Sequence, residues 1–314
     1  MITSAEIKEY ALNIGFDGCG ICRATDVGDE QRGYFNRWIN NSFHAGMDYM
    51  ERNRDKRFNP ELLVESTRSI ICVALNYYPH RRQNENHPQF AYYAYGKDYH
   101  DVVKSKLNNL LDYIKSADCG VEGRAFVDTA PLLERYWAAK SGLGFIGKNS
   151  LLIIPKKGSY YFLGFLFVNI ELEYDDPLHL SCGNCTRCLE ACPTKAIVSP
   201  KIVDSLKCIS YQTIENKGEI DSTTLPHLGN KIYGCDVCQQ VCPHNRFATP
   251  THIEEFIPDQ LFLELSIDKL EGLTTEEYRC IFKGSAVKRA KFEGLKRNLE
   301  AMKQSKIIFE NNNR

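Results

Sequence analysis

The sequence predicts an α+β protein built from a mixed α/β domain, a cysteine-rich domain and a short helical C-terminal segment. Three observations predict this fold class. Strand and helix patterns alternate before residue 176, eight of the 13 cysteines fall between Cys182 and Cys242, and helical patterns return after Pro250. The 314 residues are 43% hydrophobic and 25% charged, so the chain can bury a core and form two domains. We place the parts at residues 1–176, 177–250 and 251–314.

Strands and helices alternate along the first domain. The segment Ser69–Tyr78 is rich in β-forming residues and predicts a buried strand, whereas Asp101–Ser116 has its apolar residues on one helical face. A proline in the first turn favours a helix over Pro131–Lys140. The remaining predictions are strands at Arg124–Asp128, Ser150–Ile154 and Tyr160–Ile170, a turn at 156–158 between the last two, and a domain boundary at Asp175–Pro177.

Charge and hydropathy limit the compartment and the partners. With 39 basic and 40 acidic residues the net charge is -1, so a nucleic-acid partner requires a local basic face. The charged N-terminus does not resemble a secretory signal, and the longest apolar run, Tyr160–Val168, is about half of the ~20 residues in a membrane helix. We therefore expect a cytoplasmic protein without membrane association, in which clustered cysteines bind metal rather than form disulfides.

The cysteines carry the strongest motif. Cys182-x2-Cys185-x2-Cys188-x3-Cys192, followed by proline, has the spacing of a bacterial ferredoxin motif. In that motif three thiolates of one loop bind one 4Fe–4S cluster, and the fourth cysteine binds the other cluster. A second set repeats the pattern with its first member displaced. The spacing predicts one cluster on Cys182, Cys185, Cys188 and Cys242, and another on Cys192, Cys208, Cys235 and Cys238.

Structural zinc is the alternative explanation for paired cysteines. A zinc site takes four ligands from two pairs. It leaves the third cysteine of the C-x2-C-x2-C run and both cysteines that precede proline without a role. The spacing therefore favours two 4Fe–4S clusters. Because about 175 residues precede them, we expect the clusters to deliver electrons to a second centre or a substrate site.

Other short motifs are weak. The run Gly142–Gly147 (GLGFIG) matches a dinucleotide fingerprint, but a predicted helix precedes it and a strand follows it, the reverse of the required order. Cys19 and Cys22 form a CxxC, for which a glycine-rich turn is a better explanation than a redox pair. Either Asp98 or Asp101 fits a helix N-cap, and Asp128, taken alone, fits a helix-initiating residue better than a catalytic one.

Several motifs together resemble one family. They are Asp98–Asp101 (DYHD), Val127–Pro131 (VDTAP), Gly142–Asn149 (GLGFIGKN), Lys207–Tyr211 (KCISY), Gly229–Asp236 (GNKIYGCD) and the twin cysteine motif, in that order. They make the chain similar to the epoxyqueuosine reductases, cobalamin-dependent enzymes of the last step of queuosine synthesis in tRNA. The resemblance extends from about Ala5 to Asn298.

The resemblance implies a fold and a chemistry. The first domain would bind cobalamin in a nitroreductase-like fold, similar also to reductive dehalogenases. The second would be a ferredoxin-like domain whose two 4Fe–4S clusters pass electrons from an external donor to cobalt. The reduced cobalamin would then remove the epoxide oxygen of epoxyqueuosine in tRNA. Val103 stands where a DxHxxG motif needs glycine, so we expect base-off cobalamin without a protein histidine on cobalt. We also expect the protein to be a monomer.

The resemblance also assigns site residues. Asp128 matches the family's proton donor, because cleavage of an epoxide C–O bond leaves an alkoxide that a positioned acid can protonate. Such an acid needs a raised pKa, which burial against a large cofactor could supply. Arg57 matches a cofactor-contacting arginine. The other expected cofactor-binding residues lie in the matching motifs: Tyr95, Gly96, Asp98, Tyr99, His100, Lys148, Asn149, Ser210, Cys235 and Asp236.

The C-terminal segment departs from the family. Many members continue into helical repeats that help to hold tRNA, whereas this chain stops soon after Asn298. The predicted helix Ser285–Lys303 has a basic side that either contacts tRNA phosphates or is a solvated face. That side consists of Lys288, Arg289, Lys291, Lys296 and Arg297.

Two other functions stay open at this point. One is a small-molecule reductive dehalogenase that uses the same cofactors, and the other is a ferredoxin-like electron carrier whose large domain only docks a partner. A bound corrinoid would exclude the carrier. A steep salt dependence of substrate binding would favour tRNA over a small molecule.

Overall fold

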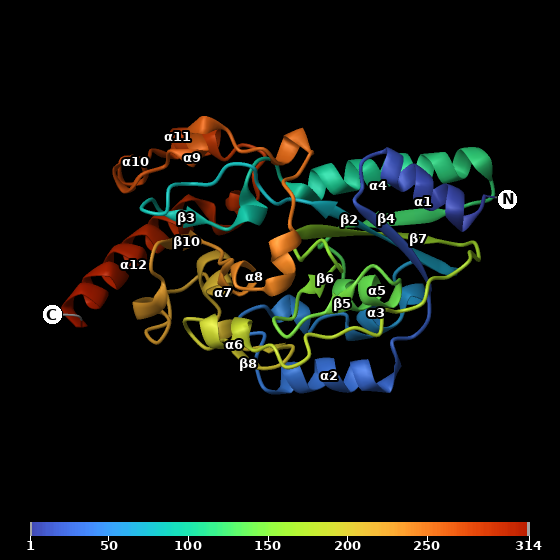
Figure 1. The fold of residues 1–314 in the computed structure, drawn as a ribbon, viewed down its shortest axis with the longest axis horizontal. Coiled ribbons are helices and arrows are strands. Elements are labelled where there is room, and N and C mark those ends of the chain that lie inside the picture. Colours follow the sequence, from blue (N-terminus) through green and yellow to red (C-terminus); the bar gives the residue numbers. More distant parts are fainter. Residues whose placement is uncertain (1, 313–314) are drawn as a thin grey trace.

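The computed structural model of the chain describes residues 2–312. An antiparallel sheet in the order β1-β2-β7-β4 organises the first domain. Helices cover both of its faces, with α1 and α4 on one side and α2, α3 and α5 on the other (Figure 1). The strands are β1 (Gly18–Arg23), β2 (Ser69–Asn76), β4 (Gly123–Phe126) and β7 (Tyr161–Val168). The helices are α1 (Ser4–Asn13), α2 (Gly28–Asn40), α3 (Arg54–Phe58), α4 (Tyr99–Ala117) and α5 (Glu134–Lys140).

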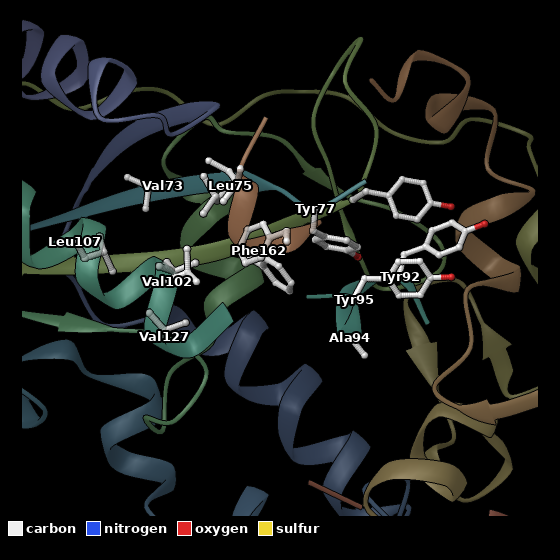
Figure 2. Close-up of a cluster of buried hydrophobic side chains, with 14 of the residues drawn as sticks. Val73, Leu75, Tyr77, Tyr92, Ala94, Tyr95, Val102, Leu107, Val127 and Phe162 are labelled. Carbon is white, nitrogen blue, oxygen red and sulfur yellow. The ribbon is translucent and has the colours of Figure 1, made fainter. Parts of the chain in front are cut away.

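The two faces of the sheet bury two apolar clusters, and the larger one lies under α4. Figure 2 shows Val73 and Leu75 of β2 close to Leu107 of α4 and Phe162 of β7. All eight residues of β2 are buried, as expected for a strand covered on both faces. Gly164 of β7 lets α4 approach closely, because a Cβ at this position would lie 2.7 Å from Cγ1 of Val103.

The cysteine-rich domain consists of short elements joined by loops. Its elements are α6 (Arg187–Ala191), β8 (Ile197–Ser199), β9 (Ile202–Val203), α7 (Ile209–Ile214), β10 (Lys231–Tyr233) and α8 (Val237–Gln240). Strand β10 pairs in parallel with β3 (Gln89–Phe90), so this domain is hydrogen-bonded to the first. A separate hairpin joins β5 (Phe145–Ile146) to β6 (Leu152–Ile153).

The C-terminal segment packs on the first domain through apolar side chains. Phe256, Phe262 and Met302 belong to the same core cluster as the residues under α4. Its helices are α9 (Gln260–Leu263), α10 (Ile267–Glu271), α11 (Thr275–Ile281), a 3-10 helix at Ala286–Ala290 and α12 (Lys291–Asn312). Residues 313 and 314 of this predicted segment lie outside the described residues. No helix among residues 2–312 is long and apolar enough to cross a membrane.

The structure confirms the predicted strand at Ser69–Tyr78 and the predicted helix at Asp101–Ser116, which are β2 and α4. The predicted helix from Pro131 begins only at Glu134, because Leu132 bonds back to Ala130 in a turn. The single helix predicted at Ser285–Lys303 is wrong. A 3-10 helix ends at Ala290, and α12 begins at Lys291, whose φ of 62° breaks the helical path.

The cysteines of the CxxC lie in a strand and not in a turn. Both belong to β1, where Cys19 packs against the core under α4 and Cys22 lies in the cluster on the opposite face of the sheet. A strand places residues three apart on opposite faces, so a redox pair at this CxxC is wrong. Gly20 between them packs against the backbone, since a Cβ there would lie 2.1 Å from the Ser141 carbonyl oxygen.

Candidate active site and cysteine loops

Asp128 lies just beyond β4, in a loop with strained backbone. Its φ of 52° places a non-glycine residue in the left-handed region, which costs roughly 1–2 kcal/mol. The backbone N–H of Asp128 donates to Oε1 of Glu134 at 2.7 Å, and Glu134 is the first residue of α5. Asp128 therefore does not initiate that helix, whose N-cap is Leu133, and its carboxylate is free for other contacts.

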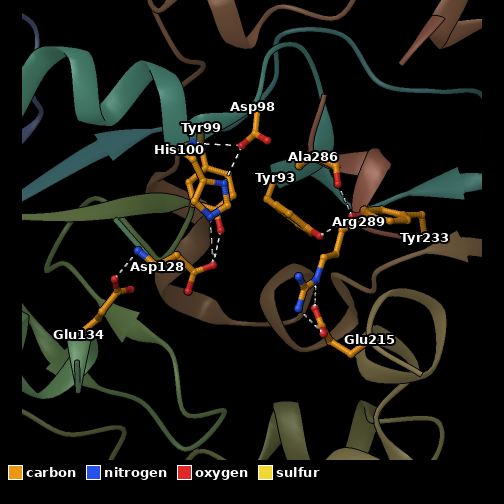
Figure 3. A network of polar contacts seen from close by, with 10 residues as sticks. All are labelled: Tyr93, Asp98, Tyr99, His100, Asp128, Glu134, Glu215, Tyr233, Ala286 and Arg289. Carbon is orange, nitrogen blue, oxygen red and sulfur yellow. Dashed lines mark hydrogen bonds and ion pairs between the residues drawn. The ribbon is translucent and has the colours of Figure 1, made fainter. Parts of the chain in front are cut away.

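The Asp128 carboxylate belongs to a polar network at the N-terminus of α4 (Figure 3). Its Oδ2 accepts a hydrogen bond from the Tyr99 hydroxyl and lies 3.6 Å from Nε2 of His100. On the other side of the imidazole, Nδ1 lies 2.7 Å from Oδ1 of Asp98, the N-cap of the helix. The Tyr99 ring is stacked between His100 and Phe162, at centroid distances of 4.1 and 4.3 Å. Packing thus fixes two of the groups that contact Asp128.

The network separates the pKa values of its members. Burial alone would lower the pKa of His100, but hydrogen bonds and charge from Asp128 and Asp98 raise it to about 9. Burial would raise the pKa of Asp128, but hydrogen bonds from His100 and Tyr99 hold it below its ordinary value. The raised pKa that the sequence argument required of Asp128 is therefore wrong for this structure. Burial, and then the charge of Asp128, raise the pKa of Glu134 to about 8 instead.

A second group of charged residues, which includes Arg289, Glu215 and Arg57, lies near Asp128 and is called the second wall of the site. Arg289, from the 3-10 helix before α12, donates two hydrogen bonds of 2.8 Å to the Glu215 carboxylate (Figure 3). Burial raises the pKa of Tyr49 to about 12, and the charges of Glu215, Arg289, Asp128 and Arg57 also act on its hydroxyl. The Tyr49 hydroxyl therefore lies within electrostatic range of all four groups.

Arg57 is a buried cation with an unused donor. It lies in the short helix α3, is 6% exposed, and donates from Nη2 to the Tyr49 carbonyl oxygen at 3.0 Å. Its Nε has no hydrogen-bond partner among the described residues. Burial lowers the pKa of Arg57. A buried, unpaired guanidinium donor is costly, so this position suits a ligand that presents acceptor atoms.

The structure gathers the eight clustered cysteines into two adjacent sets. Within each set, burial and then the charge of neighbouring thiols raise the pKa of several members. The first set is Cys182, Cys185, Cys188 and Cys242. The second set is Cys192, Cys208, Cys235 and Cys238. The charge of Cys188 also raises the pKa of Cys238, so the two sets are neighbours. Among residues 2–312, no three His, Cys, Asp or Glu side chains are spaced to hold one metal ion.

Backbone donors point at the sulfurs of both sets. Lys148 N–H lies 3.4 Å from Sγ of Cys182, and Ala196 N–H lies 3.2 Å from Sγ of Cys192. Lys148 also holds the first cysteine loop through its Nζ, which donates to the carbonyl oxygens of Gly183 at 2.7 Å and Cys185 at 2.9 Å. The expected pocket residue Lys148 is thus engaged with this loop.

Three other expected cofactor-binding residues lie where the first domain meets the cysteine-rich domain. Ser210 directs its backbone N–H at Cys208, and Asn149 is buried beside the Cys238 carbonyl. Asp236, next to Cys235, accepts a 2.8 Å hydrogen bond from Tyr92 N–H, and burial raises its pKa to about 7.

Tyr95 and Gly96 pack in the interior. Tyr95 is 1% exposed and its hydroxyl lies 3.4 Å from Oε1 of Gln83, so it is a core residue. Gly96 has a φ of 68° and lies against the C-terminal segment, where a Cβ would lie 2.4 Å from the Glu255 carbonyl oxygen.

Sequence reasoning missed Glu134 and Tyr49 as members of the site. Glu134 showed only as an acidic residue inside a predicted helix, and Tyr49 belongs to no motif. It also overestimated the basic side of the C-terminal helix. Lys296 donates to the Leu270 and Glu271 carbonyl oxygens, and Arg297 donates to the carbonyl oxygens of Gln212, Asn216 and Gly218. Lys288, Arg289 and Lys291 remain exposed.

Comparisons with known proteins agree on one family. A family model for epoxyqueuosine reductase QueG (DUF1730) matches residues 57–129, and a 4Fe-4S double cluster binding domain matches residues 181–245. An epoxyqueuosine reductase from Cellulophaga algicola is 46% identical over 95% of this chain and 97% of its own length. One from Escherichia coli is 38% identical over 90% of this chain and 76% of its own.

Solved structures give the same result. The crystal structure of an epoxyqueuosine reductase with an epoxyqueuosine-modified tRNA-Tyr stem loop has a TM-score of 0.88 at 32% identity, over 95% of this chain and 80% of that one. The Streptococcus thermophilus enzyme has a TM-score of 0.88 at 30% identity, over 97% and 82%. The mixed α+β fold, the double cluster domain and nearly full-length similarity lead to one conclusion. This chain belongs to the epoxyqueuosine reductase family.

Proposed function

We propose that this chain reduces epoxyqueuosine in tRNA to queuosine, with two 4Fe–4S clusters, base-off cobalamin and Asp128 as proton donor. The observation that carries the proposal is the position of the Asp128 carboxylate. It stands on a strained loop, contacts Tyr99 and His100, and faces the wall that contains Arg57 and Arg289. Strained residues with perturbed pKa values concentrate at functional sites.

The cysteine loops fit two 4Fe–4S clusters. The thiols of each set lie close together, and Cys182, Cys192 and Cys208 accept hydrogen bonds from backbone N–H groups, an environment that stabilises negatively charged clusters and tunes their potential. A cluster contains four irons, so its thiolates lie further apart than the ligands of one ion. We assign Cys182, Cys185, Cys188 and Cys242 to one cluster. We assign Cys192, Cys208, Cys235 and Cys238 to the other.

The residues around Asp128 fit a large cofactor with acceptor groups. Arg57 offers its unpaired Nε, and its neighbour Tyr49, whose carbonyl oxygen accepts from Nη2 of Arg57, is 41% exposed. The site connects to the cysteine domain through Tyr93, whose hydroxyl donates to that of Tyr233 at 3.2 Å, two residues before Cys235. When bound, cobalamin would supply a strongly reducing cobalt centre fed by the clusters. We propose that Arg57 and Tyr49 hold it and that electrons come from an external donor.

The protein's own residues supply the proton. Opening an epoxide leaves an alkoxide oxygen, which needs an acid within hydrogen-bond distance. The Asp128 side chain is exposed, and contacts of its Oδ2 with Tyr99 and His100 fix its orientation. Glu134 holds the loop that carries it. For tRNA we propose phosphate contacts from the exposed Lys288 and Lys291, which position the substrate rather than specify its sequence.

Anaerobic reconstitution with iron, sulfide and cobalamin tests the proposal. The loaded protein is mixed with epoxyqueuosine-containing tRNA and a strong reductant, and the nucleosides are analysed by mass spectrometry. Loss of one oxygen from the modified nucleoside is the expected result. Corrinoid binding without tRNA turnover would favour a small-molecule reductase, and absence of corrinoid binding would favour an electron carrier.

A further inference from the structure

We propose that His100 is the proton source behind Asp128, passing protons from its Nε2 to Oδ2 of the carboxylate during each turnover. The inference rests on the proposed function. Removing an epoxide oxygen as water takes two electrons and two protons and leaves a carbon–carbon double bond. The electrons come from the external reductant, but Asp128 is held ionised by its partners and carries neither proton in the resting protein. The site therefore needs a proton carrier in contact with Asp128.

His100 has the geometry of such a carrier. Its Nε2 lies 3.6 Å from Oδ2 of Asp128, an ion-pair distance that a small side-chain rotation shortens to a hydrogen bond. Its Nδ1 lies 2.7 Å from Oδ1 of Asp98, so the Nδ1 proton stays directed at that carboxylate. The imidazolium can then release only its Nε2 proton toward Asp128. Asp98 is itself fixed as the N-cap of α4, accepting the His100 backbone N–H at 3.1 Å.

The charge state of the site supports this order of transfer. Asp128 is held ionised by its partners, so in the resting protein it has no proton to donate. His100 is protonated at neutral pH because two carboxylates flank its ring. As the substrate oxygen becomes an alkoxide, it takes a proton from Asp128, and Asp128 takes one from Nε2. Neutral His100 keeps its Nδ1–H on Asp98 and regains a proton from solvent through its 33% exposed side chain. The recharged His100 then supplies the second proton through Asp128 by the same route.

Other ionisable groups face this network from several elements. The charge of Lys288 lowers the pKa of Asp98, and the charge of Arg135 lowers the pKa of Asp128. The charge of Asp128 in turn raises the pKa of Arg289. Glu134 contributes to the raised pKa of Tyr99. The full set of charged or titratable groups around His100 and Asp128 is Tyr49, Tyr93, Asp98, Tyr99, Glu134, Arg135, Lys288 and Arg289. Among the described residues, His100 combines a transferable proton at neutral pH, a ring nitrogen facing the Asp128 carboxylate and access to solvent, whereas Glu134 contacts the backbone N–H of Asp128 and not its carboxylate.

Two variants of the reconstituted holoenzyme test the proposal through the pH profile of turnover. Wild-type turnover should fall above about pH 9, as His100 loses its proton. Asp98→Asn keeps a good N-cap and the imidazole but removes one flanking charge, so the falling limb should move down by at least one pH unit. For a shift of one pH unit, the ratio of turnover at pH 6.5 to that at pH 8.5 should then rise about threefold. His100→Ala should lose about 10- to 100-fold and regain turnover with added imidazole.

A second readout does not depend on turnover. Histidine labelled with ¹³C at Cε1 gives one NMR signal per ring, and the signal missing from His100→Gln identifies His100. Its titration midpoint should lie near 9 in the wild type and lower in Asp98→Asn. His227→Gln, an exposed histidine elsewhere, is the matched control and should change neither profile.

The outcomes separate this inference from the proposed function. If wild-type holoenzyme leaves epoxyqueuosine tRNA unchanged, the proposed function fails. If the wild type turns over but the pH profile of Asp98→Asn is that of the wild type, or imidazole does not restore His100→Ala, the proton-source role is overturned. A His100 midpoint near the ordinary value of about 6.5 would also overturn it.

Discussion

The backbone N–H of Asp128 donates a 2.7 Å hydrogen bond to the side chain of Glu134, six residues further along the chain. The bond stabilises Asp128 at a positive φ and directs its carboxylate away from α5 and toward the N-terminus of α4. One acidic residue thus positions another. Glu134 can do so at neutral pH because its raised pKa, about 8, keeps it protonated and limits repulsion between the two carboxyl groups.

Replacing Glu134 should separate its structural role from its charge. Glu134→Gln retains an acceptor for the Asp128 N–H, so turnover at pH 7 should stay within about threefold of wild type. Glu134→Ala removes the acceptor and frees the loop, which should lower turnover about tenfold or more. Steady-state rates at pH 7 measure both, with the exposed Glu122→Gln as control. Equal losses in Gln and Ala would show that the hydrogen bond does not hold the loop.

Glu134 should also make stability depend on pH. Its folded-state pKa, about 8, lies above its ordinary value of 4.5, so its contribution to stability is complete below pH 4.5 and is lost as pH rises through 8. The free energy of unfolding of wild type, relative to Glu134→Gln, should therefore decrease between pH 5 and pH 9. Anaerobic urea unfolding at both pH values measures the difference. A constant difference would contradict the raised pKa.

Asp128→Asn should retain cofactors and lose turnover. Asparagine fills the same space and still accepts the Tyr99 hydrogen bond, but it cannot pass a proton. Turnover should fall about 10²- to 10⁴-fold, the usual contribution of a general acid. Absorption spectra of the clusters and corrinoid should match wild type, and Asp112→Asn on the exposed side of α4 serves as control. Unchanged turnover would remove Asp128 from the mechanism.

Cys238→Ser should remove one cluster. Cys238 is buried in the second cysteine set, so the variant should bind about half of the roughly eight irons expected for two clusters. Cys280→Ser, an exposed cysteine outside both sets, should bind the full amount. Iron and sulfide analysis after anaerobic reconstitution measures the outcome. Full iron content in Cys238→Ser would contradict the assignment of this ligand.

Arg57→Lys should weaken corrinoid binding without removing the charge. Lysine lacks the Nε donor that Arg57 leaves unpaired, and it cannot reproduce the geometry of a guanidinium. Loss of one hydrogen bond to the cofactor should raise the dissociation constant about tenfold. Absorption titration with cobalamin measures it, and Arg54→Lys in the same short helix is the matched control. Equal affinity in both variants would exclude Arg57 from the cofactor site.

Basic residues of the C-terminal segment should divide into two groups. Lys288→Ala and Lys291→Ala should each weaken tRNA binding and reduce the slope of log affinity against log salt by about 1. Lys296→Ala should leave that slope unchanged and lower the melting temperature, because Lys296 holds two carbonyl oxygens at the end of α10. Filter binding at several salt concentrations distinguishes the groups. A reduced slope in Lys296→Ala would reverse the assignment.

The sequence alone determined which cysteines form each set. Cysteines two or three residues apart are brought together by a single loop, so their spacing is a local property that the sequence records, and the exchange of Cys192 and Cys242 between the sets follows the ferredoxin pattern. Helix α4 and strand β2 were predicted for a similar reason, because their apolar patterns have the period of one element. The N-cap role of Asp98 is equally local.

Only the tertiary structure decided the proton chemistry of the site. His100 and Asp128 meet because α4 packs on β4 and β7, which brings the start of the helix to the end of the strand. The sequence argument expected burial to raise the pKa of Asp128, but hydrogen bonds from His100 and Tyr99 have the opposite sign and outweigh burial. A pKa depends on every charge and donor within a few ångströms, and the chain supplies those groups from distant segments. Sequence spacing fixes local ligand sets, whereas packing between elements fixes which groups share a proton.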